Sequence, residues 1–85
     1  MAATNTQTLL LLPGDGIGVE VTREAVRVLD HICAKYGHKA HLKEALLGGI
    51  AIHKTGGPFP AETEALARDA DATLMGAVGL PEFDN

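Results

Sequence analysis

The sequence predicts an α/β domain with a parallel sheet, built in the order β-α-β-α-β. Two apolar runs, Leu9–Leu12 and Ala72–Val78, are typical of strands that are buried on both faces of a sheet. Two helical patterns lie between these runs, with one further strand between the helices. Strands that alternate with helices in this way pair in parallel through right-handed crossovers.

The first strand is expected over Thr8–Leu12. A helix is expected after the loop Pro13–Gly18, because apolar residues then recur with helical spacing at Val21, Ala25, Val28, Leu29 and Ile32. An amphipathic helix of this kind packs its apolar stripe on the core. Gly37 follows the pattern and is expected to end the helix as its C′ residue.

The second half of the chain predicts the remaining elements. His38–Leu46 alternates loosely and indicates a second, less buried strand, and Ile50–His53 is expected to form one helical turn between glycine-rich segments. A second full helix is expected over Ala61–Ala70, followed by the third, buried strand Ala72–Val78. Residues 1–7 are expected to be a loose tail, and residues 8–85 a partial, incomplete α/β domain.

Composition narrows the class of protein. With 85 residues the chain has room for one small domain but not for a catalytic and a substrate domain together. The net charge of −4 argues against binding to nucleic acid or to an anionic membrane through bulk electrostatics. The run Leu9–Leu12 is too short to span a bilayer, and the single Cys33 cannot form an internal disulfide. A soluble, cytoplasmic protein is therefore expected.

The four histidines do not indicate a metal site. His31, His38 and His41 are separated by a helix end and a strand, and no pair has the i, i+4 spacing of a zinc site on one helix. We expect surface or partly buried histidines, and we assign no catalytic or metal-binding residue within this chain.

Two glycine-rich loops follow strands of the expected sheet. Because ligands bind beyond the carboxyl ends of strands in open α/β sheets, Pro13–Gly18 and Gly76–Pro81 would both lie along the ligand-binding edge. The helix after the first loop would offer free N–H groups to an anion. The loop is not the dinucleotide fingerprint, because Val19 stands where that pattern needs glycine. A tight turn without ligand and a nucleotide-binding loop both remain open, and Asp15 is interpreted as a turn or helix-start acceptor rather than a catalyst.

Five segments, taken in order, carry a family resemblance. They are Leu12–Val21, Gly48–Ile52, Gly57–Pro60, Asp69–Ala72 and Gly76–Pro81. Together they resemble the start of the 3-isopropylmalate dehydrogenases, within the isocitrate/isopropylmalate dehydrogenase family. The resemblance runs from Thr8 to Asn85 and covers only the opening part of a family protein that is several times longer. Isocitrate, homoisocitrate and tartrate dehydrogenases share the first loop, so these substrates remain alternatives.

The resemblance implies the fold, the reaction and the cofactors. It implies the N-terminal β-α-β-α-β portion of a parallel-sheet, isopropylmalate dehydrogenase-like fold, in which residues 8–85 are part of the cofactor-side domain. The implied reaction is the NAD-dependent oxidation of 3-isopropylmalate and its Mg²⁺- or Mn²⁺-assisted decarboxylation, in leucine biosynthesis, by a homodimer. The catalytic and metal-binding groups would come from sequence beyond residue 85, so we expect the isolated chain to be inactive.

The resemblance also implies which residues contact the cofactor. Ile17 matches a position that packs against the adenine side of NAD. The residues after the third strand match the start of the cofactor-binding segment, namely Gly79, Leu80, Pro81, Glu82, Phe83, Asp84 and Asn85. The sequence departs from the family pattern where Val19 replaces a usual proline, His53 a usual aspartate, and Leu80–Phe83 a usual Gly-Pro-Lys-Trp.

A second hypothesis belongs to a different class of function. The chain could be a noncatalytic remnant that binds nucleotide weakly or associates with a full-length dehydrogenase chain. Whether coding sequence continues past Asn85 separates the two hypotheses. Under either one, the expected partners include no nucleic acid and no membrane.

Overall fold

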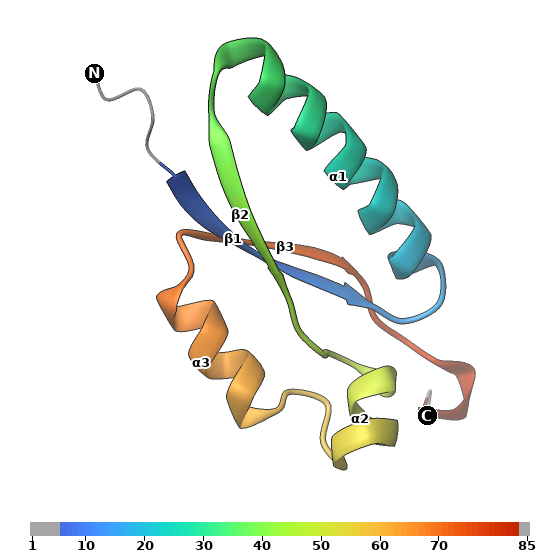
Figure 1. Cartoon of the computed structure of the whole chain (residues 1–85). Helices are drawn as coiled ribbons and strands as arrows, with labels where there is room; N and C mark the ends of the chain where they lie inside the picture. The colour runs from blue at the N-terminus through green and yellow to red at the C-terminus, as the bar shows by residue number, and fades with distance from the viewer. Residues whose placement is uncertain (1–5, 84–85) are drawn as a thin grey trace.

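The computed structural model describes residues 6–83, which form a single three-stranded parallel sheet with helices on both faces (Figure 1). The strand order is β2-β1-β3. Along the chain the elements are β1 (Thr6–Gly14), α1 (Ile17–Tyr36), β2 (Lys39–Glu44), α2 (Gly49–Thr55), α3 (Ala61–Asp69), β3 (Ala72–Ala77) and the 3₁₀ turn η1 (Pro81–Phe83). The predicted β-α-β-α-β order and the parallel pairing are confirmed.

The connections explain why the helices lie on opposite faces. The chain moves from the central strand β1 outward to β2 through α1, and then back across β1 to β3 through α2 and α3. Right-handed crossovers that run in opposite directions place their helices on opposite faces of the sheet. Figure 1 shows this arrangement, with α1 on one face and α2 and α3 on the other.

The core lies on the central strand. Leu10, Leu11 and Leu12 of β1 are buried, and Ala51 of α2 is buried beneath them. Because β1 has a neighbouring strand on each side and helices on both faces, its side chains are covered from every direction, as the continuous apolar run predicts. β2 is half-exposed, which also agrees with the sequence pattern.

Helix α1 ends as predicted but begins at Ile17, inside the segment expected to be a loop, and its predicted apolar face is only partly covered. It ends at Gly37, which is left-handed with φ 75° and donates its N–H to the carbonyl of Cys33. The side chains that pack inward are those of Thr22, Leu29 and Cys33, which are buried or half-buried. The prediction of core packing is wrong for three residues that are exposed, Val21, Val28 and Ile32.

Val21, Val28 and Ile32 are exposed because the sheet beneath α1 is narrow. Each exposed residue comes one position before an inward-facing one, and one position turns the helix by about 100°. Three strands cover one side of a 20-residue helix but do not reach around to the neighbouring flank. The apolar stripe of α1 is therefore wider than the surface on which it packs.

Strand β3 is less buried than predicted. Its residues are exposed or half-buried, and the side chain of Met75 is 55% exposed. An apolar run predicts burial on both faces, but β3 lies at an edge of the sheet, where neighbouring structure covers it from one side only. The prediction of a buried third strand is wrong for this reason.

The helix α2 and the 3₁₀ turn η1, which lie near the carboxyl edge of the sheet, also differ from the sequence prediction. α2 extends over Gly49–Thr55 and is therefore longer than the single turn expected over Ile50–His53. The 3₁₀ turn η1 has no counterpart among the sequence predictions.

Close packing of α1 on β3 generates a first prediction. A Cβ atom on Gly76 would lie 2.5 Å from the carbonyl oxygen of Pro13 and 2.7 Å from that of Gly18. Backbone atoms cannot rotate away, so Gly76→Ala should lower the free energy of unfolding by about 1–3 kcal/mol. Urea denaturation measures this. Gly57→Ala is the control, because a Cβ there meets nothing within 4 Å; an equal loss in both variants would contradict the packing argument.

The unequal edges of the sheet generate a second prediction. The β2 edge carries Lys39, Lys43 and Glu44, whereas β3 has no charged residue, and no strand pairs with its outer edge within residues 6–83. Uncharged open edges favour association between chains. The isolated chain should therefore self-associate, and Met75→Lys should shift it toward monomer in sedimentation velocity. Val28→Lys places the same charge on an exposed apolar position of α1, and an equal effect there would argue against the edge as the cause.

Candidate functional site

The loops that follow β1 and β3 meet at the carboxyl edge of the sheet. The backbone N–H of Asp15 donates a hydrogen bond of 2.7 Å to the carbonyl of Ala77, and Gly14 is the register partner of Ala77. The expectation that both glycine-rich loops lie along one edge is confirmed. We call this region the Asp15 corner and define it as Gly14–Gly16, Gly48–Ile50 and Val78–Leu80.

The corner is organised around one carboxylate. Asp15 is only 4% exposed. Its Oδ2 accepts the backbone N–H groups of Gly49 and Gly79, each at 2.8 Å, and its Oδ1 accepts that of Ile50 at 2.7 Å. A buried carboxylate is tolerated when charge-assisted hydrogen bonds of this kind replace its hydration. Asp15 thereby joins three segments that are far apart in the sequence.

Asp15 also explains why α2 begins at Gly49. Gly48 precedes the helix and supplies no capping side chain, so the first N–H groups of α2 need an acceptor from elsewhere. A Cβ on Gly48 would lie 2.7 Å from Oδ2 of Asp15 and 2.9 Å from Cγ1 of Val78, so only glycine leaves room for the carboxylate. Asp15 is a helix-start acceptor, but for α2, which lies 34 residues away.

The start of α1 is less open to an anion than the sequence suggests. The N–H of Gly18 donates to the carbonyl of Asp15 at 2.8 Å, and that of Val19 donates to the carbonyl of Gly16 at 3.2 Å. The loop closes on itself as a tight turn and uses these two donors internally. The expectation of free N–H groups at this helix start is therefore wrong for Gly18 and Val19.

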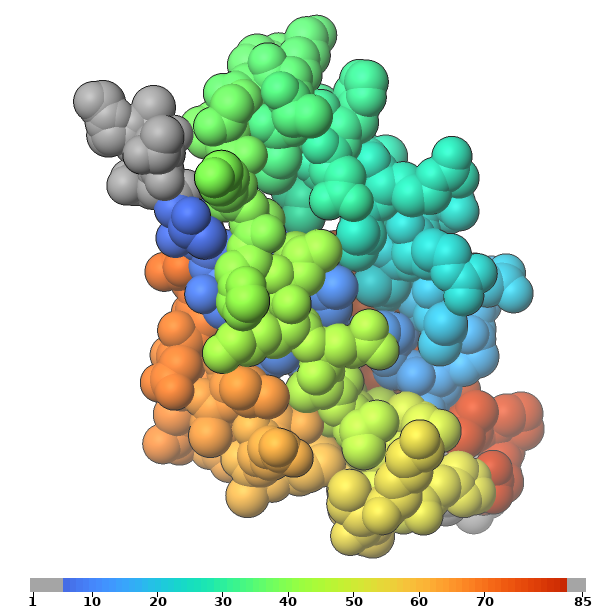
Figure 2. Space-filling model, in the orientation of Figure 1, coloured from blue at the N-terminus to red at the C-terminus, as the bar shows by residue number. Residues whose placement is uncertain are grey.

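The segment after β3 runs from the corner along α2. Leu80 packs against Gly49, where an added Cβ would lie 2.5 Å from its Cδ1. Oε1 of Glu82 lies 2.9 Å from Nε2 of His53, so a half-exposed hydrogen bond links η1 to α2. Figure 2 shows this segment, in red, directly against α2, in yellow. His53 and Glu82 are two of the positions at which the sequence departs from the family pattern, and the structure brings them into contact.

The other residues assigned to the cofactor lie around the same edge or outside the described residues. Ile17 is the first residue of α1, is 67% exposed, and takes no part in the Asp15 hydrogen bonds. Pro81 is exposed in η1, and the backbone of Phe83 ends that turn. Asp84 and Asn85 lie outside the described residues.

The hydrogen bonds of Asp15 set its charge state. The N–H of Gly79 contributes most to lowering the pKa of the carboxyl below its ordinary value; burial opposes this, and the N–H groups of Ile50 and Gly49 and the nearby His53 lower it further. Asp15 is therefore a carboxylate at neutral pH. A charged, fully bonded group of this kind holds structure and is not poised to exchange protons.

Residues 6–83 contain neither a metal-ligand cluster nor a membrane-spanning helix. No group of three or more histidine, cysteine, aspartate or glutamate residues in that range could hold a metal ion. No helix in it combines the length and the apolar composition needed to cross a bilayer.

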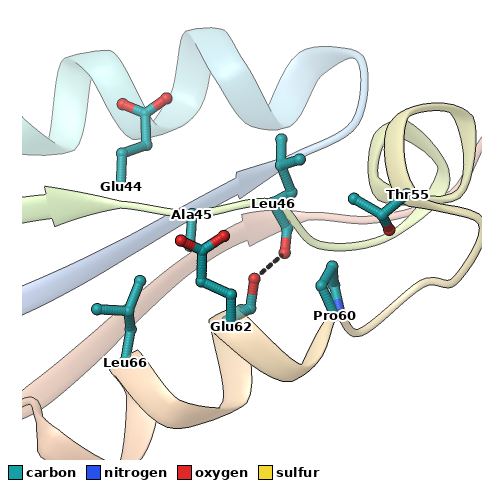
Figure 3. A pocket seen from close by; sticks show the side chains of 8 residues that line it. Glu44, Ala45, Leu46, Thr55, Pro60, Glu62 and Leu66 are labelled. Carbon is teal, nitrogen blue, oxygen red and sulfur yellow. Dashed lines mark hydrogen bonds between the residues drawn. The ribbon is translucent and has the colours of Figure 1, made fainter.

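A hollow of about 150 Å³ lies between the end of β2 and α3, beside Glu44 and Glu62 (Figure 3). The hydroxyl of the buried Thr63 donates to the carbonyl of Leu46 at 2.7 Å and closes part of its floor. Sites for cofactors have volumes of about 300–1,000 Å³. This hollow is too small for one.

Comparison with known proteins decides the family. A family model described as isocitrate/isopropylmalate dehydrogenase matches residues 8–85. The chain belongs to this family. The 3-isopropylmalate dehydrogenase of Chromohalobacter salexigens is 51% identical over 79 residues, and that of Bacteroides fragilis strain YCH46 is 47% identical over 77 residues. These alignments cover 93% and 91% of this chain and 22% of each relative.

Solved structures of the family have the same fold. The apo β-decarboxylating dehydrogenase of Thermococcus kodakarensis matches with a TM-score of 0.76 at 33% identity. The isocitrate dehydrogenase of Methylococcus capsulatus matches with a TM-score of 0.78 at 26% identity. Each match covers 93% of this chain and 22% of the other. The chain thus spans about a fifth of the length of its relatives, with the parallel α/β fold of this family.

Acid should destabilise the fold through Asp15. Because its folded-state pKa is lowered, its contribution is complete above the unfolded-state pKa of about 4 and is lost as the pH falls through the folded-state value. Urea denaturation at about pH 6 and about pH 3 should show a larger acid loss in the wild type than in Asp15→Asn. Asp30→Asn removes an exposed carboxylate instead. If it reduces the acid loss as much as Asp15→Asn does, Asp15 is not the source.

Proposed function

We propose that this chain is the N-terminal part of an NAD-dependent 3-isopropylmalate dehydrogenase, a cytoplasmic homodimer of leucine biosynthesis, and that the 85 residues alone are inactive. The observation that carries the proposal is the identity of 46–51% to 3-isopropylmalate dehydrogenases over nearly the whole chain. The geometry of the carboxyl edge supports it, because the two loops assigned to the cofactor lie side by side there.

The described residues fit a contact with the adenine side of NAD. Ile17 offers exposed apolar surface on which a base would pack. A Cβ on Gly16 or Gly79 would meet nothing within 4 Å, so a ligand could approach the backbone closely at both loops. In this proposal Ile17 packs on the adenine and Gly79–Asn85 forms the start of the wall beside the cofactor. NAD itself accepts the hydride from the substrate.

The same residues do not fit a divalent metal. Mg²⁺ and Mn²⁺ need several oxygen ligands, and residues 6–83 bring no such group of carboxylates together. The carboxylate of Asp15, which is buried, is already committed to three backbone donors. In the proposal the metal ligands and the acid-base group belong to other parts of the full-length enzyme, and this explains the expected inactivity of the chain.

A chimera tests the proposed function. The 79 residues of the Chromohalobacter salexigens enzyme that align with this chain would be replaced by the matching residues of this chain. The chimera should form NADH from NAD in the presence of 3-isopropylmalate, in preference to isocitrate, homoisocitrate or tartrate. The pure 85-residue chain should form none. Activity of the isolated chain, or a chimera that prefers another substrate, would contradict the proposal.

The role of Ile17 can be tested in the same chimera. Replacing an apolar contact to the base by a charge should raise KM for NAD about tenfold or more, with a smaller change in kcat. Ile32→Asp is the matched control, because Ile32 is also an exposed isoleucine of α1 but lies four turns from the loop. Equal effects of Ile17→Asp and Ile32→Asp would mean that Ile17 does not contact the cofactor.

A further inference from the structure

The three hydrogen bonds of Asp15 join two segments that have few other links. Gly49 and Ile50 are the first two residues of α2, and Gly79 lies between β3 and η1. Besides the carboxylate, the contacts here include the packing of Leu80 on Gly49, the close approach of Val78 to Gly48, and the half-exposed pair of His53 and Glu82. The carboxylate is the buried member of this set.

The arrangement of the donors requires a carboxylate. Oδ2 accepts from Gly49 and Gly79 while Oδ1 accepts from Ile50, so both oxygens must be acceptors at once. An asparagine has one acceptor oxygen and one NH₂ donor, and in either orientation its NH₂ group would face at least one backbone N–H. A glutamate side chain is one carbon longer than that of aspartate, and the corner has little free space for it. A Cβ atom added to Gly48 would already lie 2.7 Å from Oδ2 of Asp15.

We propose that Asp15 is a positioning residue, whose two oxygens hold the segment after β3 in register with the N-terminus of α2. In this view the segment from Gly79 onward takes its place at the edge because a single carboxylate binds it and α2 together. Only the description of this segment as a cofactor wall rests on the proposed function. The hydrogen bonds and their test do not depend on NAD.

Amide hydrogen exchange of the ¹⁵N-labelled 85-residue chain, followed by NMR, tests the proposal. In Asp15→Ala the amides of Gly49, Ile50 and Gly79 should all exchange about tenfold faster or more. In Asp15→Asn the oxygen should occupy the position with two donors, so Ile50 should be accelerated more than Gly49 and Gly79. The amides of Leu10–Leu12 in the core report whether the fold persists.

Asp71→Ala is the matched control. Oδ2 of Asp71 accepts the backbone N–H of Thr8 at 2.7 Å, near the amino ends of the strands β1 and β3. This variant should accelerate Thr8 and leave Gly79 unchanged. If Asp15→Ala accelerates Gly79 no more than Asp71→Ala does, or accelerates Leu10–Leu12 as strongly as Gly79, the positioning role is wrong.

A titration of the unmodified chain provides a test that needs no variant. The amide proton shifts of Gly49, Ile50 and Gly79 should change together, with one common midpoint below 3.8, as Asp15 takes up its proton. Glu82, which contacts His53 beside this corner, is a second carboxyl near these amides, so Glu82→Gln should leave the common midpoint in place if Asp15 is its source. Separate midpoints for Gly79 and the two α2 amides would overturn the proposal. Neither measurement uses cofactor, so a failure of the proposed function would leave these results unaffected.

Discussion

The ionised carboxylate of Asp15 is the constraint on which the carboxyl edge of this sheet depends. An uncompensated carboxylate would be costly at this depth, and three backbone N–H groups converge to replace the water it loses. The carboxylate and the start of α2 need each other. The charge needs the donors, and the start of α2 needs an acceptor that its own Gly48 does not provide. Small residues at 48 and 49 follow from the space that the carboxylate and its neighbours occupy.

Elements with strong local signals were predictable from the sequence. The C-terminal end of α1, the central buried strand and the parallel order follow from helical spacing, a continuous leucine run and the alternation of elements. The exposed fraction of Val21, Val28 and Ile32 was not predictable in this way. Periodicity tells which side of a helix is apolar, but not how many strands lie beneath it, and the same limit applies to the exposed Met75 in the edge strand.

The candidate site was predictable in place but not in detail. Two glycine-rich loops at strand ends correctly locate the edge. The three partners of Asp15 lie 34, 35 and 64 residues away from it in the sequence, and His53 lies 29 residues from its partner Glu82. No local sequence pattern reveals contacts at these separations. The one available signal for Asp15 was the Gly48-Gly49 pair before a helix that lacks a capping side chain. The two family departures at His53 and Glu82 are individually uninformative and become meaningful only as a hydrogen-bonded pair.

The long reach of Asp15 has a consequence for the order of events during synthesis. Asp15 leaves the ribosome 64 residues before Gly79, its last partner. At about 5–20 residues per second, this delay is about 3–13 s. Through that interval β1, α1 and β2 can associate, but the carboxylate must remain hydrated because one of its donors does not yet exist. Burial of the charge is thus a late event, which is complete only after β3 and Gly79 have been made.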